Sequence, residues 1–164
     1  MQLWFIRHAR AVDREETSLS DFQRPLTPKG RKQFAQLCGS LAKGIDLPQL
    51  LLTSPLIRAM QTVEIARREF ELPATACRVD DRLSPDFDMQ DLRGILSDVM
   101  VEQPNLDRLG IVGHEPSFSE VLSETIGGGA IKLAKGAIAA VEILDPSSVQ
   151  PARLLWLATP KLFA

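Results

Sequence analysis

Residues 3–8 read Leu-Trp-Phe-Ile-Arg-His, so an uninterrupted apolar run is followed at once by an arginine and a histidine. A short run of this kind is typical of a strand that is buried on both faces of a sheet. Arg7 and His8 then lie where that strand ends, and His8 is one of only 2 histidines in the chain. The stretch predicts a central strand over residues 3–6 that carries two ionisable side chains to its carboxyl end.

Short apolar runs recur along the chain and alternate with amphipathic segments. Runs that predict further strands cover residues 50–52, 77–79, 109–112, 137–144 and 153–158. The last two are separated by a loop rich in proline and serine, and we expect them to pair as a hairpin at one edge of the sheet. The chain contains no internal repeat or linker, which predicts a single domain over residues 1–164.

Apolar residues spaced three and four apart predict helices between these strands. The first helix is expected to open at Thr27-Pro28 and the second at Thr53-Ser54-Pro55, because a capping residue precedes proline at each point. The apolar positions of the helices, in chain order, are Phe34, Leu37, Cys38, Leu41 and Ile45; Ala59, Val63, Ala66 and Phe70; Met89, Leu92, Leu96, Val99 and Met100; and Phe118, Val121, Leu122 and Ile126. The alternation predicts an α/β fold with three layers, in which helices flank a mostly parallel central sheet with one antiparallel edge strand.

The composition narrows the function classes. The chain has 164 residues and a formal net charge of -2, which argues against a dedicated nucleic-acid binder because such proteins usually carry a basic excess. No apolar run reaches the length of a membrane span and the start lacks a signal-peptide pattern, so we expect a cytoplasmic protein without a membrane partner. Cys38 and Cys77 are too few and too far apart for a zinc site or a disulfide framework. The acid-free basic stretch from Arg24 to Lys32 suits a small anionic target, and it equally suits a solvated helix start.

Three chemistry-bearing groups follow three of the predicted strands: Arg7-His8, the segment 54–58 that ends in Arg58, and Gly113-His114. The carboxyl ends of strands line the ligand crevice of open α/β sheets, so these groups are expected to meet. A neutral imidazole can accept a phosphoryl group covalently, while arginines suit its non-bridging oxygens and a second histidine can donate to them. A single histidine near a strand end is more often structural, but both histidines of the chain lie at such positions, which favours a catalytic site.

Longer motifs surround these groups. They are Arg7-His8, residues 24–30 (RPLTPKG), residues 54–62 (SPLIRAMQT), residues 113–116 (GHEP) and residues 135–139 (KGAIA). With them the chain resembles the histidine phosphatase superfamily, and within it the SixA-type phosphohistidine phosphatases. The string of residues 54–62, in register with Arg-His upstream and Gly-His downstream, is the specific part of the match.

The resemblance implies a phosphoglycerate-mutase-like fold and a role for each matching residue. His8 would be the nucleophile that accepts the phosphoryl group, and Arg7, Arg58 and His114 would complete a positively charged phosphate pocket. Arg24 would contact the phosphate or the partner. The resemblance also implies a phosphatase without a metal or organic cofactor that acts on a phosphorylated histidine of a phosphotransfer protein in signal transduction.

The sequence departs from the family pattern at two places. Ala9 stands where Arg-His-Gly is usual, and the loop of residues 82–88 has Pro85 where a carboxylate proton donor is common. Candidate donors are Asp86, Asp88 and Glu115. An alkoxide leaving group needs such an acid, whereas phosphohistidine can leave as neutral imidazole, so a weak donor favours a P–N substrate over a phosphate ester.

Other functions remain open at this point. A small-molecule phosphomonoesterase of the same superfamily and a non-catalytic domain that binds phosphorylated partners both fit the motifs. A cysteine-based phosphatase is excluded because Gly44 and Leu83, rather than arginine, lie six positions after the two cysteines. Residues 86–88 lack the preceding apolar strand of an aspartate-based, magnesium-dependent phosphatase. No amphipathic seam is left over that demands a partner subunit.

Overall fold

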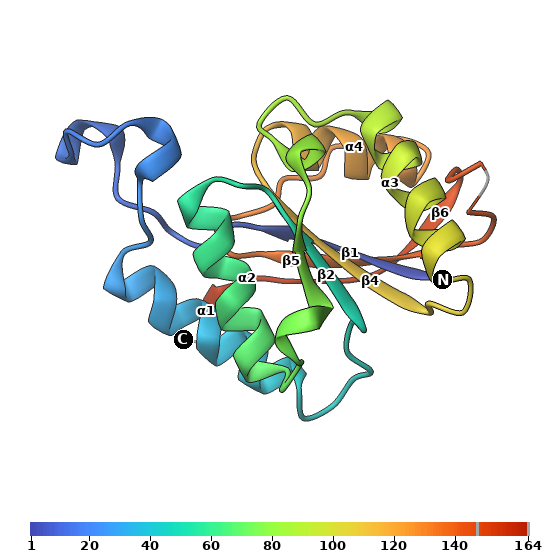
Figure 1. The fold of residues 1–164 in the computed structure, drawn as a ribbon, viewed down its shortest axis with the longest axis horizontal. Coiled ribbons are helices and arrows are strands. Elements are labelled where there is room, and N and C mark those ends of the chain that lie inside the picture. Colours follow the sequence, from blue (N-terminus) through green and yellow to red (C-terminus); the bar gives the residue numbers. More distant parts are fainter. Residues whose placement is uncertain (147, 164) are drawn as a thin grey trace.

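A mixed six-stranded sheet runs through the middle of the computed structural model, which describes residues 1–146 and 148–163 (Figure 1). The strands are β1 Gln2–Arg7, β2 Leu50–Thr53, β3 Cys77–Val79, β4 Arg108–Gly113, β5 Ile138–Ile143 and β6 Ala152–Ala158. The flanking helices are α1 Pro28–Leu41, α2 Ile57–Glu69, α3 Met89–Glu102 and α4 Ser117–Thr125. The positions of the strands agree with the prediction from sequence. The arrangement as one α/β domain with three layers confirms the predicted fold class.

The order of the strands is β3-β2-β4-β1-β5-β6, and β1 to β4 run parallel to one another. The predicted hairpin at one edge of the sheet is confirmed, because the edge strand β6 pairs antiparallel with β5. β5 in turn pairs antiparallel with β1, and the hairpin then reverses the chain. The edge strand β6 therefore runs in the same direction as β1.

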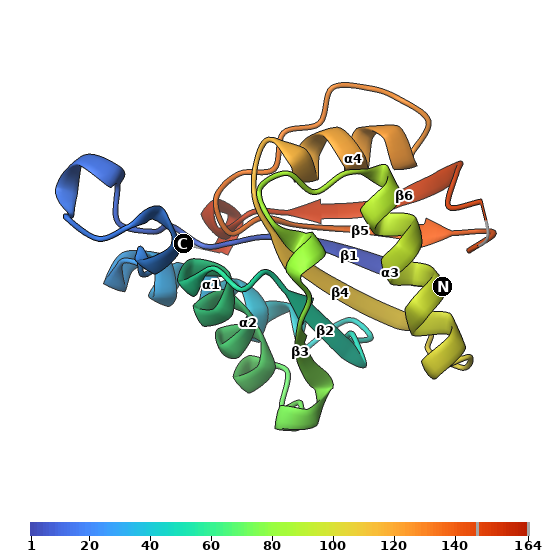
Figure 2. The ribbon, with the colours of Figure 1, turned by 45° about the horizontal axis from the view of Figure 1, so that its top comes forward.

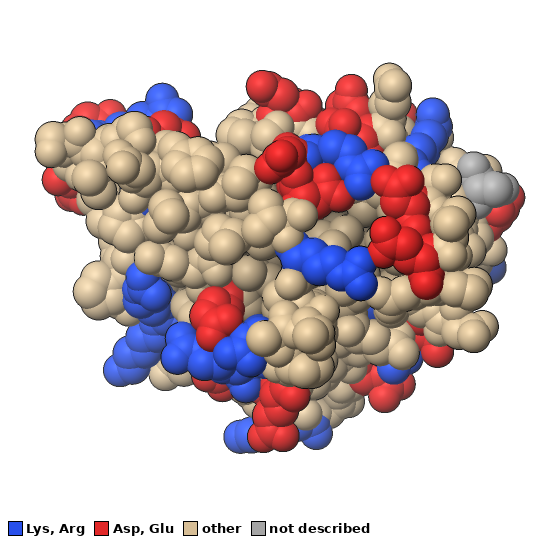
Figure 3. All heavy atoms as spheres, in the orientation of Figure 1, with Lys and Arg blue, Asp and Glu red and all other residues tan. Residues whose placement is uncertain are grey.

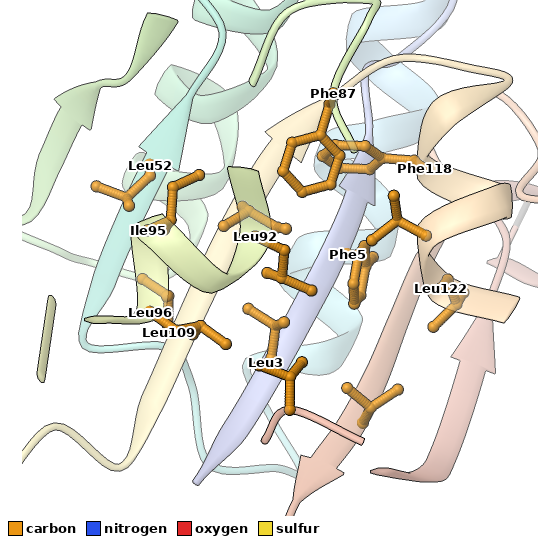
Figure 4. Packing of buried hydrophobic residues seen from close by; sticks show 14 of the residues in the cluster. Leu3, Phe5, Leu52, Phe87, Leu92, Ile95, Leu96, Leu109, Phe118 and Leu122 are labelled. Carbon is orange, nitrogen blue, oxygen red and sulfur yellow. The ribbon is translucent and has the colours of Figure 1, made fainter. Parts of the chain in front are cut away.

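Two hydrophobic cores cover the two faces of the sheet, and β1 contributes to both. Leu3 and Phe5 point into the core under α3 and α4, whereas Trp4 and Ile6 point into the core under α1 and α2. Figure 2 shows these helix pairs on opposite faces, and Figure 4 shows the side chains of the first core. Because all four of these residues of β1 are fully buried, the central strand is rigidly held up to Arg7.

The helices differ from the prediction at three positions. The second helix begins at Ile57 rather than at Thr53-Ser54-Pro55, because Ser54 Oγ accepts the Leu56 N–H in a turn that precedes it. Ile45 lies beyond the end of α1 and Met100 lies on the outer face of α3, and both are exposed. The periodicity is correct within each helix, but these two residues fall outside the buried stripes.

None of the helices in the described part of the chain is long and apolar enough to cross a membrane.

Candidate active site

The carboxyl ends of β1, β2 and β4 open into a cavity of about 330 Å³. Its lining includes all five residues that the sequence motifs single out for the phosphate pocket: Arg7, His8, Arg24, Arg58 and His114. The N–H of His8 donates to the carbonyl of Gly113 (3.0 Å), which extends the pairing of β1 with β4 past the end of the strands. This bond brings the two imidazoles together, with ring centroids 5.2 Å apart. The structure therefore brings the predicted residues together.

The ring of His8 is held in one tautomer. Its Nδ1 lies 2.7 Å from the carbonyl oxygen of Ala9, and a carbonyl can only accept, so Nδ1 carries the hydrogen. Its Nε2 accepts from Nε of Arg58 at 3.3 Å. Burial and the nearby His114, Arg58 and Arg7 lower the pKa of His8 to about 3, although the Ala9 carbonyl opposes the shift. At neutral pH His8 is thus uncharged and has its lone pair on Nε2.

The residue after His8 is anchored by the motif of residues 54–62. The N–H of Ala9 donates to Thr62 Oγ1 (3.0 Å), and the Thr62 hydroxyl donates to the carbonyl of Arg58 (2.7 Å). Gln61, which belongs to the same motif, accepts the N–H of Leu26 through Oε1 (2.8 Å). Leu26, like Ala9, lies in the segment between β1 and α1. The side chain of Ala9 is buried in the core under α1 and α2, so alanine fits where the family usually has glycine.

Arg58 lies in the first turn of α2 and uses all of its nitrogens. Besides His8, it contacts Asp21 through Nη1 to the carbonyl oxygen (2.7 Å) and through Nη2 to Oδ2 (3.1 Å). Asp21 also accepts from Arg24 (2.8 Å) and Arg14 (3.0 Å). Partial burial opposes ionisation, but the hydrogen bonds and charges of Arg24 and Arg58 lower the pKa of Asp21 to about 2. Asp21 is therefore a carboxylate that orients the guanidinium groups of the cavity.

Sequence reasoning missed Asp21. It lies in the irregular segment between β1 and α1, which projects beside the carboxyl end of β1 (Figures 1 and 2). No strand end or motif marks it, and the one available signal is an acid three residues before Arg24. Of the basic stretch that begins with Arg24, only Arg24 itself is in the lining of the cavity.

The other two pocket residues have unused donor positions. Arg7 donates through Nη1 to the carbonyl of Leu133 (2.7 Å), while its Nε is buried and has no partner among the described residues. His114 lies 2.8 Å from Ser54 Oγ through Nε2, and its Nδ1 is likewise buried and unpartnered there. Burial and the charge of Arg58 lower the pKa of His114 to about 3. Free polar nitrogens in a cavity rich in arginine suit the oxygens of a phosphoryl group.

The structure separates the three candidate proton donors. Asp88 caps α3, where its side chain accepts the Asp91 N–H (2.9 Å), and Asp86 is exposed; neither lines the cavity. Glu115 does line it, and the hydroxyl of Ser119 contacts both of its carboxyl oxygens at 2.7 and 2.8 Å. Burial raises the pKa of Glu115. Glu115 is thus the one candidate of the three that lines the cavity, and its raised pKa shifts it toward the protonated form.

Charge is mixed around the site and over one face of the molecule (Figure 3). Acidic and basic side chains are interspersed over the face shown in Figure 3. Within the described ranges, no three His, Cys, Asp or Glu side chains gather in a way that could hold a metal ion. The cationic side chains that line the cavity are Arg7, Arg14, Arg24, Arg58 and Lys135.

Comparison with known proteins agrees with the geometry. Residues 3–118 match the model of the histidine phosphatase superfamily (branch 1). The structure of the protein histidine phosphatase SixA complexed with tungstate superposes with a TM-score of 0.86 at 25% identity, over 100% of both chains. A putative SixA from Agrobacterium tumefaciens has a TM-score of 0.75 at 20% identity, over 97% of this chain and 98% of that one.

A curated but uncharacterized protein from Picosynechococcus is 42% identical over 66 residues, which are 40% of this chain and 39% of that protein. This match spans about two fifths of the relative's length. The family match is far longer, and it includes the strands that carry both histidines. The chain belongs to the histidine phosphatase superfamily, branch 1, and among its members it resembles the SixA-type phosphohistidine phosphatases.

Proposed function

We propose that this phosphatase works through a covalent phosphohistidine at Nε2 of His8 and that its substrate is a phosphorylated histidine on another protein. The observation that carries the proposal is the state of His8. Its hydrogen is held at Nδ1 by the Ala9 carbonyl, and its Nε2 lone pair faces Arg58. A neutral imidazole among cationic side chains has both the nucleophile and the charge stabilisation that phosphoryl transfer requires.

In the first step, Nε2 of His8 forms a bond to phosphorus while the bond from phosphorus to the substrate nitrogen breaks. The departing nitrogen keeps the electron pair of the broken bond. It leaves as neutral imidazole because the other nitrogen of the substrate ring carries a hydrogen. Arg7, Arg58 and His114 stabilise the charge on the non-bridging oxygens, which increases as the transfer proceeds.

In the second step, water attacks phosphorus and Nε2 of His8 leaves. The carbonyl of Ala9, 2.7 Å from Nδ1, keeps the ring hydrogen in place throughout. The phosphorylated ring is therefore cationic, and it departs as neutral imidazole without an external acid. The proton released by the water ends on the inorganic phosphate, and the enzyme returns to its starting state.

Glu115 is proposed as the proton donor for substrates that leave as an alkoxide. Replacing it with glutamine (Glu115→Gln) is expected to lower kcat/KM for an alkyl phosphate by about 10²-fold, the usual contribution of a general acid. The same change is expected to cost phosphohistidine hydrolysis less than about tenfold, because neutral imidazole needs no proton. Initial rates on both substrates across pH measure this difference.

The pH profile gives an independent check on Glu115. A carboxylic acid with a raised pKa donates only below that pKa, so ester hydrolysis by the wild type should decline as pH rises through it. Glu115→Gln should lack this decline. Asp88→Asn is the matched control, since Asp88 caps α3 outside the cavity, and it should keep the wild-type profile. Equal losses on both substrates in Glu115→Gln would contradict the role of proton donor.

The substrate class is tested by comparing three phosphorylated substrates in the presence of EDTA. They are a phosphotransfer domain phosphorylated on histidine, a receiver domain phosphorylated on aspartate, and p-nitrophenyl phosphate. We expect the phosphohistidine domain to have the highest kcat/KM, and we expect the rate to be unchanged by EDTA because arginines supply the positive charge. Preference for the ester would instead favour a small-molecule phosphomonoesterase. We propose that residues 1–164 form one phosphatase domain that serves a cytoplasmic signalling relay.

A further inference from the structure

The second histidine of the cavity has one nitrogen bound and one free. Nε2 of His114 lies 2.8 Å from Ser54 Oγ, while Nδ1 is buried with no partner in the described protein. A neutral imidazole carries one ring hydrogen. If Nε2 holds it, the free Nδ1 presents a lone pair to a phosphoryl oxygen and repels it. If Nδ1 holds it, the same atom is a hydrogen-bond donor.

The surroundings of Ser54 decide between these states. Its Oγ accepts the N–H of Leu56 at 3.3 Å, and the residue is fully buried. Among the described residues, the one acceptor within reach of the Ser54 hydroxyl hydrogen is Nε2 of His114. With the hydrogen on Nε2, the serine hydroxyl would have no acceptor in a buried position, which is unfavourable. With the hydrogen on Nδ1, the N–H of Leu56, the Ser54 hydroxyl and Nε2 of His114 form a satisfied chain, and the one hydrogen left without an acceptor among the described residues is that on Nδ1. His114 lines the cavity, so a bound phosphoryl oxygen can accept this hydrogen, and the Nδ1–H state is then the one in which every donor is paired.

We propose that Ser54 is a positioning residue whose hydroxyl fixes His114 as the Nδ1–H tautomer and so provides an N–H donor to the phosphoryl group. The role rests on the proposed function, since it concerns the same transfer to His8. It also assigns a role to the serine of the motif at residues 54–62, which the sequence pattern alone does not indicate.

Both histidines then carry their hydrogen on Nδ1, yet they act in opposite ways. In His8 the Ala9 carbonyl takes the Nδ1 hydrogen, so Nε2 is left to attack phosphorus. In His114 the serine hydroxyl occupies Nε2, so Nδ1–H is left to donate. Because His114 is neutral, it donates a hydrogen bond without placing a second positive charge beside the guanidinium group of Arg58.

The tautomer can be measured directly, because the chain has only 2 histidines and gives two imidazole spin systems in a long-range ¹H–¹⁵N spectrum. Each is assigned by loss of its signals in His8→Asn or His114→Asn. In the wild type near pH 7 with saturating inorganic phosphate, we expect His114 to show a protonated Nδ1 and an unprotonated Nε2. A protonated Nε2 in the folded, phosphate-bound wild type would overturn the proposal, whatever the variants do.

Ser54→Ala tests the consequence for catalysis. We expect the His114 signals to move toward the Nε2–H tautomer and kcat to fall by about 10–100-fold, the loss that is typical when the hydrogen-bond partner that orients a metal-binding histidine is removed. KM should change by less than about threefold, because the donor acts mainly in the transition state. A fall in kcat with an unchanged tautomer, or a changed tautomer with an unchanged kcat, would each refute the assignment.

Ser117→Ala is the matched control. The Ser117 hydroxyl is also buried and also contacts His114, but it donates to the backbone carbonyl (3.2 Å) rather than to the ring. This variant should keep both the tautomer and kcat. Labelling with ³²P-phosphohistidine separates the two proposals: Ser54→Ala should still form phospho-His8, only more slowly. Absence of labelled His8 in the wild type would refute the covalent mechanism and leave the tautomer result standing on its own.

Discussion

Replacing His8 with asparagine (His8→Asn) is expected to reduce phosphohistidine hydrolysis by at least about 10³-fold, because loss of a covalent nucleophile removes the whole two-step route. Asparagine is smaller than histidine, and its amide can still donate to the Ala9 carbonyl that receives Nδ1–H in the wild type. The variant should therefore retain the fold and lose the nucleophilic Nε2 atom. The measurement is kcat for a phosphohistidine domain, with circular dichroism as the check on folding.

Chemical trapping identifies the nucleophile independently of the rate. Wild-type protein quenched during turnover of a ³²P-labelled substrate should carry label that is stable to base and released by acid, as expected for a P–N bond. His8→Asn should carry none. His114→Asn is the matched control, because it removes the other histidine of the cavity and leaves His8 able to accept the label slowly. Label on His8→Asn comparable to wild type would show that another residue is the nucleophile.

The residues at strand ends could be predicted because the sheet imposes their convergence. Arg7, His8 and His114 follow runs that are apolar throughout, and parallel strands place their carboxyl ends along one edge of a sheet. Arg58 could be placed from the helix that follows β2, even though that helix begins later than predicted. In each case the sequence pattern locates the end of a strand, and the geometry of a parallel sheet brings those ends together, so these site residues can be predicted from sequence alone.

Asp21 and Glu115 show where sequence reasoning stops. Asp21 comes from an irregular segment, and its position depends on tertiary contacts with Arg14, Arg24 and Arg58 that no local pattern encodes. Glu115 and Asp88 look equally suitable as donors in the sequence. The difference is that Asp88 is engaged by the capping box of α3 while Glu115 lines the cavity. The choice between two acids follows from which hydrogen bonds each already makes.

Arg58→Lys is expected to lower kcat/KM by about 10²–10³-fold, the usual cost of removing one donor that is preorganised for transition-state charge. Lysine keeps the positive charge but has a single ammonium group. Arg58 holds Asp21 through Nη1 and Nη2, which frees its Nε edge to face Nε2 of His8. One ammonium cannot occupy these positions at once, so the alignment of charge with the nucleophile is lost.

The control for Arg58→Lys is the same substitution further along the same helix. Arg68 is largely exposed and pairs with Glu64 within α2, so Arg68→Lys should leave kcat/KM unchanged. Product inhibition by inorganic phosphate adds a second readout, because a misplaced cation should also weaken phosphate binding. If Arg58→Lys kept near-wild-type kcat/KM, a positive charge alone would be sufficient, and the planar guanidinium group that Asp21 holds would be irrelevant to the reaction. A large loss in Arg58→Lys with none in Arg68→Lys would instead show that the reaction needs the planar guanidinium group, which Asp21 holds through Nη1 and Nη2, and not a positive charge alone.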